Sequence, residues 1–86
     1  MAYRLYLKPK AEKNLNKLPR KDIYRIQIAL AVIASDPFSG KKLDGDHKGE
    51  WSFRVWPYRI IYKIYRHELV ILVISIGYRQ GVYNKN

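Results

Sequence analysis

The chain contains no cysteine, which excludes disulfide bonds and thiolate metal ligands. Histidine is also scarce. Its only two copies, His47 and His67, fall in a predicted loop and a predicted turn, and their spacing matches no metal site. We therefore expect both to be surface residues, and we expect the protein to use neither a metal ion nor a cofactor.

Long hydrophobic runs are absent as well. The longest unbroken apolar stretches, residues 28–34 and 69–74, are far shorter than the roughly 20 residues that a membrane span needs. Near the start, Arg4 and Lys8 are not followed by the apolar core of a signal peptide. These absences predict a cytoplasmic protein with no membrane segment.

Acidic residues are few. Seven Asp and Glu stand against 17 Lys and Arg, so the net charge is +10. Such a charge on a small body attracts polyanions, meaning nucleic acid or an acidic protein partner. A basic face that is merely solvated is the alternative, but the basic residues interleave with aromatic ones.

The 86 residues predict one domain spanning 1–86, and a hydrophobic share of 48% argues against disorder. Hydrophobic periodicity alternates between period two and the helical period. The predicted elements are a strand at residues 3–7, helices at about 9–18 and 20–35, a polar loop at 38–49, and strands at 51–56, 58–65 and 69–76, with Gly77 ending the last strand.

This order predicts an α+β fold: an N-terminal strand, a two-helix hairpin, and an antiparallel three-strand meander that completes one sheet. The last strand is almost wholly apolar, which favours a central strand covered on both faces and paired with the N-terminal strand. The second half of the second helix is also nearly all apolar, which predicts that this helix is buried on more than one side.

Three arginines are candidates for a site: Arg54 and Arg59 in the predicted strands, and Arg79 after the last one. The first two are expected to face each other. If Trp56-Pro57 forms a two-residue turn, Arg54 lies directly opposite Arg59. Like charges in that position destabilise a sheet by roughly 0.2–1 kcal/mol. Two readings remain open: both side chains extend into water, or an anion lies across both of them.

The available chemistry is narrow. No carboxylate pair lies on the arginine face, which excludes the two-carboxylate mechanisms of glycosidases and aspartic proteases. Arginine, lysine and tyrosine can stabilise a phosphorane-like transition state, and RNA brings its own nucleophile in the 2′-OH group. A metal-free ribonuclease is therefore feasible, with Arg79 and Tyr83 of the C-terminal tail as further candidates.

A set of short motifs resembles the RelE-type toxins of the RelE/ParE superfamily of toxin–antitoxin pairs. The motifs cover nearly the whole chain: Pro9–Ala11–Leu15–Lys17–Leu18-Pro19, Asp36-Pro37, Leu43–Gly45, Gly49–Trp51, Phe53-Arg54-Val55, Tyr58-Arg59-Ile60-Ile61-Tyr62 and Ile76-Gly77–Arg79–Val82-Tyr83. The resemblance implies a microbial-ribonuclease-like fold and a metal-independent mRNA endonuclease (an mRNA interferase) that cleaves codons in the ribosomal A site and halts translation. It also implies a cognate antitoxin, which we expect to be amphipathic and partly acidic.

The resemblance also assigns roles within the site. It implies that Arg59 binds phosphate, that Arg79 is catalytic, and that Tyr83 stacks on or activates the RNA. Arg54 matches the second of two basic residues that the family has on the strand before the one that carries Arg59.

Ser52 departs from the pattern, because it stands where the family usually has the first of those basic residues. Lys48 and Lys63, with Arg54 and Arg59, are then expected to bind the RNA. Two other functions stay open: a ParE-like inhibitor of DNA gyrase, and a non-catalytic module that binds RNA or the ribosome.

Overall fold

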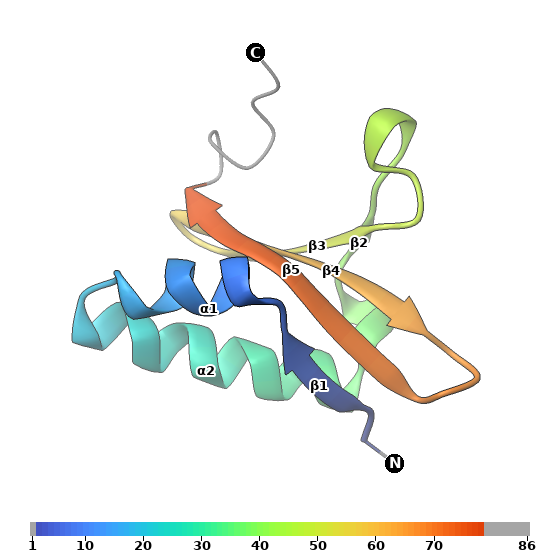
Figure 1. Cartoon of the computed structure of the whole chain (residues 1–86), viewed down its shortest axis with the longest axis horizontal. Coiled ribbons are helices and arrows are strands. Elements are labelled where there is room, and N and C mark those ends of the chain that lie inside the picture. The colour runs from blue at the N-terminus through green and yellow to red at the C-terminus, as the bar shows by residue number, and fades with distance from the viewer. Residues whose placement is uncertain (1, 79–86) are drawn as a thin grey trace.

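A computed structural model describes residues 2–78 of the chain and places two helices against one twisted sheet (Figure 1). The elements are β1 (Arg4–Leu7), α1 (Pro9–Asn16), α2 (Arg20–Ser35), a 3₁₀ turn η1 (Pro37–Ser39), β2 (Lys41–Lys42), a second 3₁₀ turn η2 (Gly45–His47), β3 (Trp51–Val55), β4 (Tyr58–Tyr65) and β5 (Val70–Tyr78).

The sheet has the strand order β1-β5-β4-β3-β2. Strands β2 to β5 pair antiparallel, whereas β1 runs parallel to β5, so the sheet is mixed. The predicted α+β class and the pairing of the N-terminal strand beside the last strand are both confirmed. The parallel pairing is possible because β1 leads into the helix hairpin, and no tight turn connects it to its neighbour.

The core lies between the helix hairpin and one face of the sheet. Because strand side chains alternate, every second residue of the long strands points at the helices. The residues of this core cluster that are at most 2% exposed are Ala11, Ile26, Ile33, Ile60, Tyr62, Ile71, Val73 and Ile76. Ile61 is also 2% exposed but is not part of the cluster.

Three predicted boundaries are wrong. Helix α1 ends at Asn16, because Lys17 and Leu18 bond back over only three residues and form a tighter final turn. Gly77 does not end the last strand, since β5 continues to Tyr78. Within the predicted loop, residues 41–42 form the edge strand β2.

The prediction that the last strand is covered on both faces is also wrong. The register of β4 and β5 shifts between Ile61 and Tyr62, which leaves Ile74 as an extra residue in β5. This bulge lets Val73 and Ile76 both face the helices, while Leu72 and Ile74 are only partly buried. The apolar run therefore reflects the bulge and does not indicate two covered faces.

Helix α1 completes the hydrogen bonds of β5 where β1 ends. The last registered pair of β1 and β5 is Leu7 with Val73. Further along β5, the backbone N–H of Ile76 donates to Oδ1 of Asn14 at 3.0 Å. A side chain of the helix thus replaces a missing strand, as a buried backbone donor requires.

The segment between α2 and β3 is fixed to the sheet by Tyr62, whose hydroxyl donates to the carbonyl oxygen of Pro37 at 2.7 Å. Gly40 then passes so close that an added Cβ would meet the Tyr62 hydroxyl and would lie 2.7 Å from the carbonyl oxygen of Ser52. Neither obstacle is a flexible chain end, so this crossing requires glycine. Lys41 follows directly and pairs with Ser52.

We predict that Gly40→Ala destabilises the protein by about 1–3 kcal/mol, because the methyl group overfills a closed contact. The free energy of unfolding in urea measures the effect. In a Tyr62→Phe background one of the two obstacles is gone, so the same substitution should cost less. An equal cost in both backgrounds would show that the Tyr62 hydroxyl is not the obstacle.

Candidate functional site

The predicted arginine pair exists. Trp56 and Pro57 form the two-residue turn between β3 and β4, Val55 pairs with Tyr58, and Arg54 pairs with Arg59. Both arginines lie on the sheet face opposite the helices, since the neighbouring residues of β3 and β4 belong to the core cluster. Arg54 is exposed and Arg59 is partly buried.

A pocket of about 310 Å³ opens beside this pair. Among residues 2–78, three of its lining side chains are cationic and none is a carboxylate; the lining residues in this range are Ser39, Gly40, Lys41, Ser52, Phe53, Arg54 and Arg59. Two hydroxyl groups complete its polar surface. Cations without a neutralising acid, together with small hydroxyl donors, suit a phosphate group.

Ser52 is buried in the floor of this region, with 3% of its surface exposed. Its Oγ accepts a hydrogen bond from Nη1 of Arg59 at 3.3 Å. The residue that departs from the family pattern therefore holds the guanidinium group of Arg59. A lysine at position 52 would put a further positive charge there, whereas serine gives Arg59 a neutral acceptor.

Lys41 was missed by the sequence-based prediction, which treated residues 38–49 as a loop. Its position follows from backbone pairing, because β2 places Lys41 opposite Ser52 at the sheet edge. A strand of two residues has no readable period, so no pattern in the sequence marks it. Leu43, in the same loop, is buried.

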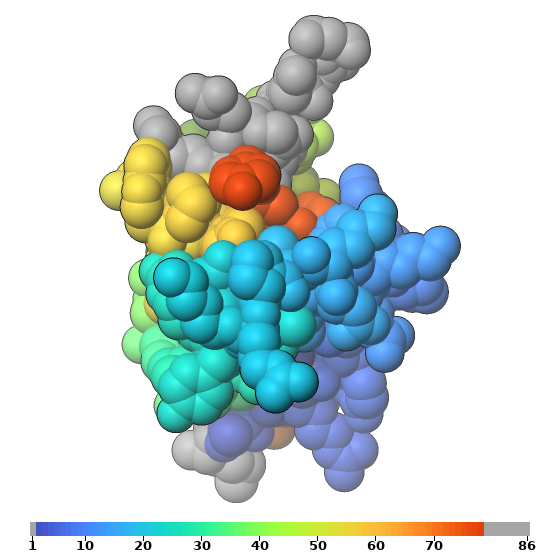
Figure 2. Space-filling model, turned by 90° about the vertical axis from the view of Figure 1, so that its left-hand side faces the viewer, coloured from blue at the N-terminus to red at the C-terminus, as the bar shows by residue number. Residues whose placement is uncertain are grey.

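The hairpin that carries both arginines is tied to the start of α2. The hydroxyl of Tyr58 donates to Oδ2 of Asp22 at 2.6 Å, and Nη2 of Arg25 donates to the carbonyl oxygen of Trp56 at 2.7 Å. Figure 2 shows this end of the hairpin, in yellow, resting above the helices. The Tyr58 ring also contacts that of Tyr78, with centroids 5.3 Å apart.

Two tyrosines at this site titrate outside their usual range. The hydrogen bond to Asp22, together with burial, raises the pKa of Tyr58 from its ordinary value of 10.0 to about 12. Burial raises the pKa of Tyr62 to about 12. Both phenols are therefore neutral donors at physiological pH, and their role is to hold the loop and the hairpin in place.

The other predicted site residues are not brought into the pocket. Lys63 shares the open face with Arg59, but it lies four residues further along β4, a separation of roughly 13 Å. Lys48 is exposed after η2 and does not line the pocket. Arg79 and Tyr83 lie outside the described residues, which end at Tyr78.

The two histidines differ from each other. His67 is exposed, as predicted. His47 is only partly exposed, with 29% of its side chain accessible, and its Nδ1 lies 3.2 Å from Oε1 of Glu50. Within residues 2–78, no group of three His, Asp or Glu side chains could hold a metal ion. Over the same range, no helix has the length and apolar character to cross a membrane.

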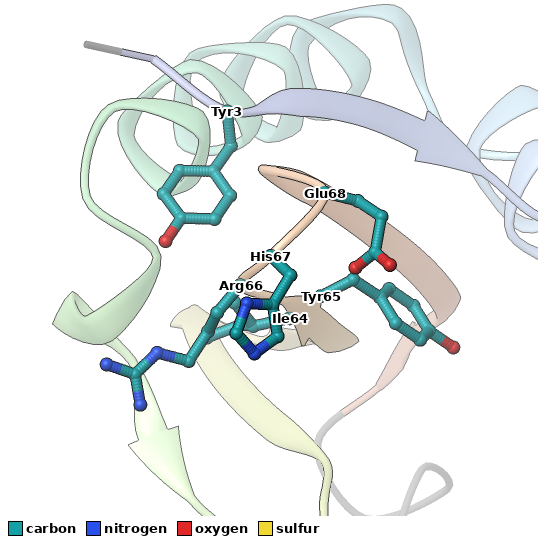
Figure 3. A pocket seen from close by; sticks show the side chains of 6 residues that line it. All are labelled: Tyr3, Ile64, Tyr65, Arg66, His67 and Glu68. Carbon is teal, nitrogen blue, oxygen red and sulfur yellow. The ribbon is translucent and has the colours of Figure 1, made fainter.

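A larger hollow of about 770 Å³ lies at the other end of the sheet (Figure 3). Tyr3 and five consecutive residues, 64–68, line it. The guanidinium group of Arg66 and the carboxylate of Glu68 point to opposite sides of it in Figure 3, so its charges do not converge. For a phosphate ligand the smaller pocket is the better site, because its lining cations are not opposed by an acid.

Comparison with known proteins agrees with the fold. A family model described as the ParE toxin of the type II toxin–antitoxin system parDE matches residues 5–83. The chain therefore belongs to this toxin family, and the resemblance to RelE-type toxins of the RelE/ParE superfamily is confirmed. A search of curated proteins found no match.

Solved structures of toxins share the fold. The toxin–antitoxin complex RelBE2 from Mycobacterium tuberculosis matches with a TM-score of 0.84 at 23% identity, covering 92% of this chain and 100% of that one. The intact E. coli RelBE complex matches with a TM-score of 0.79 at 25% identity, covering 90% and 96%. A mutant of E. coli RelE bound to an antitoxin peptide gives 0.78 at 26% identity, covering 96% and 92%.

We predict that Tyr58→Phe lowers the free energy of unfolding by about 1.5–3 kcal/mol at pH 8, because a hydrogen bond to a carboxylate is lost. The difference should shrink as the pH rises above 10. There the unfolded tyrosine ionises while the folded one keeps its proton up to about pH 12, so the wild type alone loses this stabilisation.

Urea unfolding at pH 8, 10 and 11 provides the measurement. A difference between wild type and Tyr58→Phe that stays constant across this range would contradict the role given to the bond between Tyr58 and Asp22.

Proposed function

We propose that this protein is a ribosome-dependent mRNA endonuclease, the toxin of a type II pair, acting in the cytoplasm. The observation that carries the proposal is the pairing of Arg54 with Arg59 beside a pocket that holds a third cation and no acid. A fold that needed this pair only for stability would gain by losing one charge. A bound phosphodiester would offset their repulsion.

The proposed reaction uses the RNA as its own nucleophile. The 2′-oxygen attacks the adjacent phosphorus, the bond to the 5′-oxygen of the next nucleotide breaks, and the products are a 2′,3′-cyclic phosphate and a 5′-hydroxyl end. Arg54 and Arg59 stabilise the charge that develops on the phosphate oxygens. Arg79 and Tyr83 are proposed to complete the catalytic group, by charge stabilisation and by stacking or proton transfer.

Ser52 acts in this proposal as a positioning residue, because its hydroxyl accepts from Arg59. Lys41 takes the place of the basic residue that the family pattern has at position 52, since it lines the same pocket. Lys63 and Lys48 are proposed to contact RNA outside the pocket. The ribosome supplies what a shallow cation site lacks, namely the fixed geometry of the message.

A cognate antitoxin is the proposed protein partner. Two of the similar solved structures are complexes of RelE-type toxins with RelB-type antitoxins, and a third contains an antitoxin peptide. A net charge of +10 favours an antitoxin with an acidic segment.

A second candidate is inhibition of DNA gyrase, because the matching family model carries the ParE description. This function does not require the arginine pair to contact a scissile phosphate. Loss of the arginine pair should therefore abolish mRNA cleavage, whereas inhibition of gyrase does not depend on such a phosphate contact.

We predict that Arg59→Ala reduces cleavage of mRNA in translating ribosomes by about 100-fold or more, because a donor to the transition state is lost. Primer extension on a translated message with purified protein detects the cuts. Arg54→Ala and Arg79→Ala should behave similarly. Arg20→Ala is the matched control, since it removes the same charge from the exposed start of α2.

Cuts that survive in all three variants would remove the arginines from the mechanism. Wild-type protein that makes no cuts but blocks gyrase supercoiling would move it to the second candidate. Absence of cuts with intact ribosome binding would leave a non-catalytic binding module.

A further inference from the structure

Helix α2 exposes an apolar stripe on the side that faces away from the sheet. Tyr24, Ile28 and Val32 are 66%, 51% and 43% exposed. Their spacing of four residues aligns them along one line of the helix, and Ala31 between them is also exposed. One exposed apolar side chain is ordinary, but a contiguous stripe marks a contact surface.

The stripe is not part of the core of this chain. The opposite side of α2 carries Ile26, Ala29 and Ile33, which are buried against the sheet. The prediction that α2 is buried on more than one side is therefore wrong within the described residues. A helix with two apolar sides of which one is covered leaves the second side for a partner.

Charge around the stripe indicates the kind of partner. Between Pro9 and Ser35 there are six basic residues and two acidic ones, a net charge of +4 over the helix hairpin. One of the acids, Asp22, is already bonded to Tyr58. Lys21 is exposed one turn before Tyr24, at the edge of the stripe. An apolar strip bordered by cations fits an amphipathic helix with acidic flanks.

A second copy of this chain is a poor occupant for the same reason. Symmetric pairing through α2 would bring together two hairpins of charge +4, on molecules whose net charge is +10 each. Like charges held in register across an interface oppose association.

We propose that Tyr24, Ile28 and Val32 form the docking line for an acidic amphipathic helix of the antitoxin, which rests on the proposed function. The stripe and the arginine pair lie on opposite sides of the sheet. A helix docked on α2 thus contributes affinity while leaving the cation pocket open. Neutralising the toxin requires a separate antitoxin segment that reaches the open face.

The test uses the antitoxin encoded beside the toxin gene and titration calorimetry. The double variant Tyr24→Ser with Ile28→Ser should bind it about 100-fold more weakly, because two large apolar side chains are lost from the contact. Both residues are exposed, so the melting temperature of the free toxin should be unchanged within a few degrees. Lys21→Glu should weaken binding and flatten its salt dependence.

The matched control is Tyr65→Ser with Leu69→Ser, which removes a tyrosine and an aliphatic side chain that are 41% and 43% exposed at the turn between β4 and β5. The control should bind like the wild type. Antitoxin affinity that is unchanged in the stripe variant, or equally reduced in the control, would overturn the proposal. So would a wild-type toxin that dimerises alone while the stripe variant stays monomeric.

Cleavage by the free toxin separates this inference from the proposed function. The stripe variant should cut a translated message at the wild-type rate, since α2 does not line the pocket. A wild type that never cuts contradicts the proposed function. In that case the antitoxin affinities of the wild type, the stripe variant and the control still test whether the stripe is the docking site.

Discussion

The register of the hairpin between β3 and β4 is the constraint on which the rest of this structure depends. A two-residue turn at Trp56 and Pro57 forces Arg54 and Arg59 into one cross-strand pair. A shift of one residue would send the same side chains to opposite faces and would move Tyr58 out of the core. Two kinds of contact hold the hairpin in this register. Core residues pack beneath it, and two hydrogen bonds tie it to α2: Tyr58 bonds to Asp22, and Arg25 bonds to the carbonyl oxygen of Trp56 in the turn.

The two faces of the sheet have different roles. The face toward the helices supplies the stabilising burial, with Ile60 and Tyr62 fully enclosed. The open face carries the paired arginines, whose mutual repulsion lowers the stability of the fold. Ser52 links the two requirements, because it is buried and yet accepts from Arg59. A neutral residue at this position limits the repulsion that a third adjacent cation on β3 or β4 would add.

Much of this arrangement could be predicted from the sequence. Alternation in residues 51–65 identifies both strands and their core faces, and the length of the turn then fixes the pairing of Arg54 with Arg59. The helices are visible from the recurrence of Ala11 and Leu15 and of Ile26 and Ile33. These features depend on local periods, which a single sequence carries.

The remainder depends on contacts between distant segments. The strand β2, and with it Lys41, is defined by backbone bonds to β3 that leave no pattern in the residues. The bulge at Ile74 and the bond from Ile76 to Asn14 likewise depend on how β5 meets β4 and α1. An apolar helix face predicts burial, but it does not say what covers that face, and within residues 2–78 Tyr24, Ile28 and Val32 of α2 stay exposed.

The most direct test of the central claim is a double-mutant cycle on Arg54 and Arg59, with threonine at one or both positions. Urea unfolding should show the wild type about 0.2–1 kcal/mol less stable than additivity predicts, because the two charges repel. Binding of a 2′-O-methylated RNA, which cannot be cleaved, should be lost almost as fully in each single variant as in the double. Additive stabilities together with independent losses of RNA affinity would contradict a shared phosphate site.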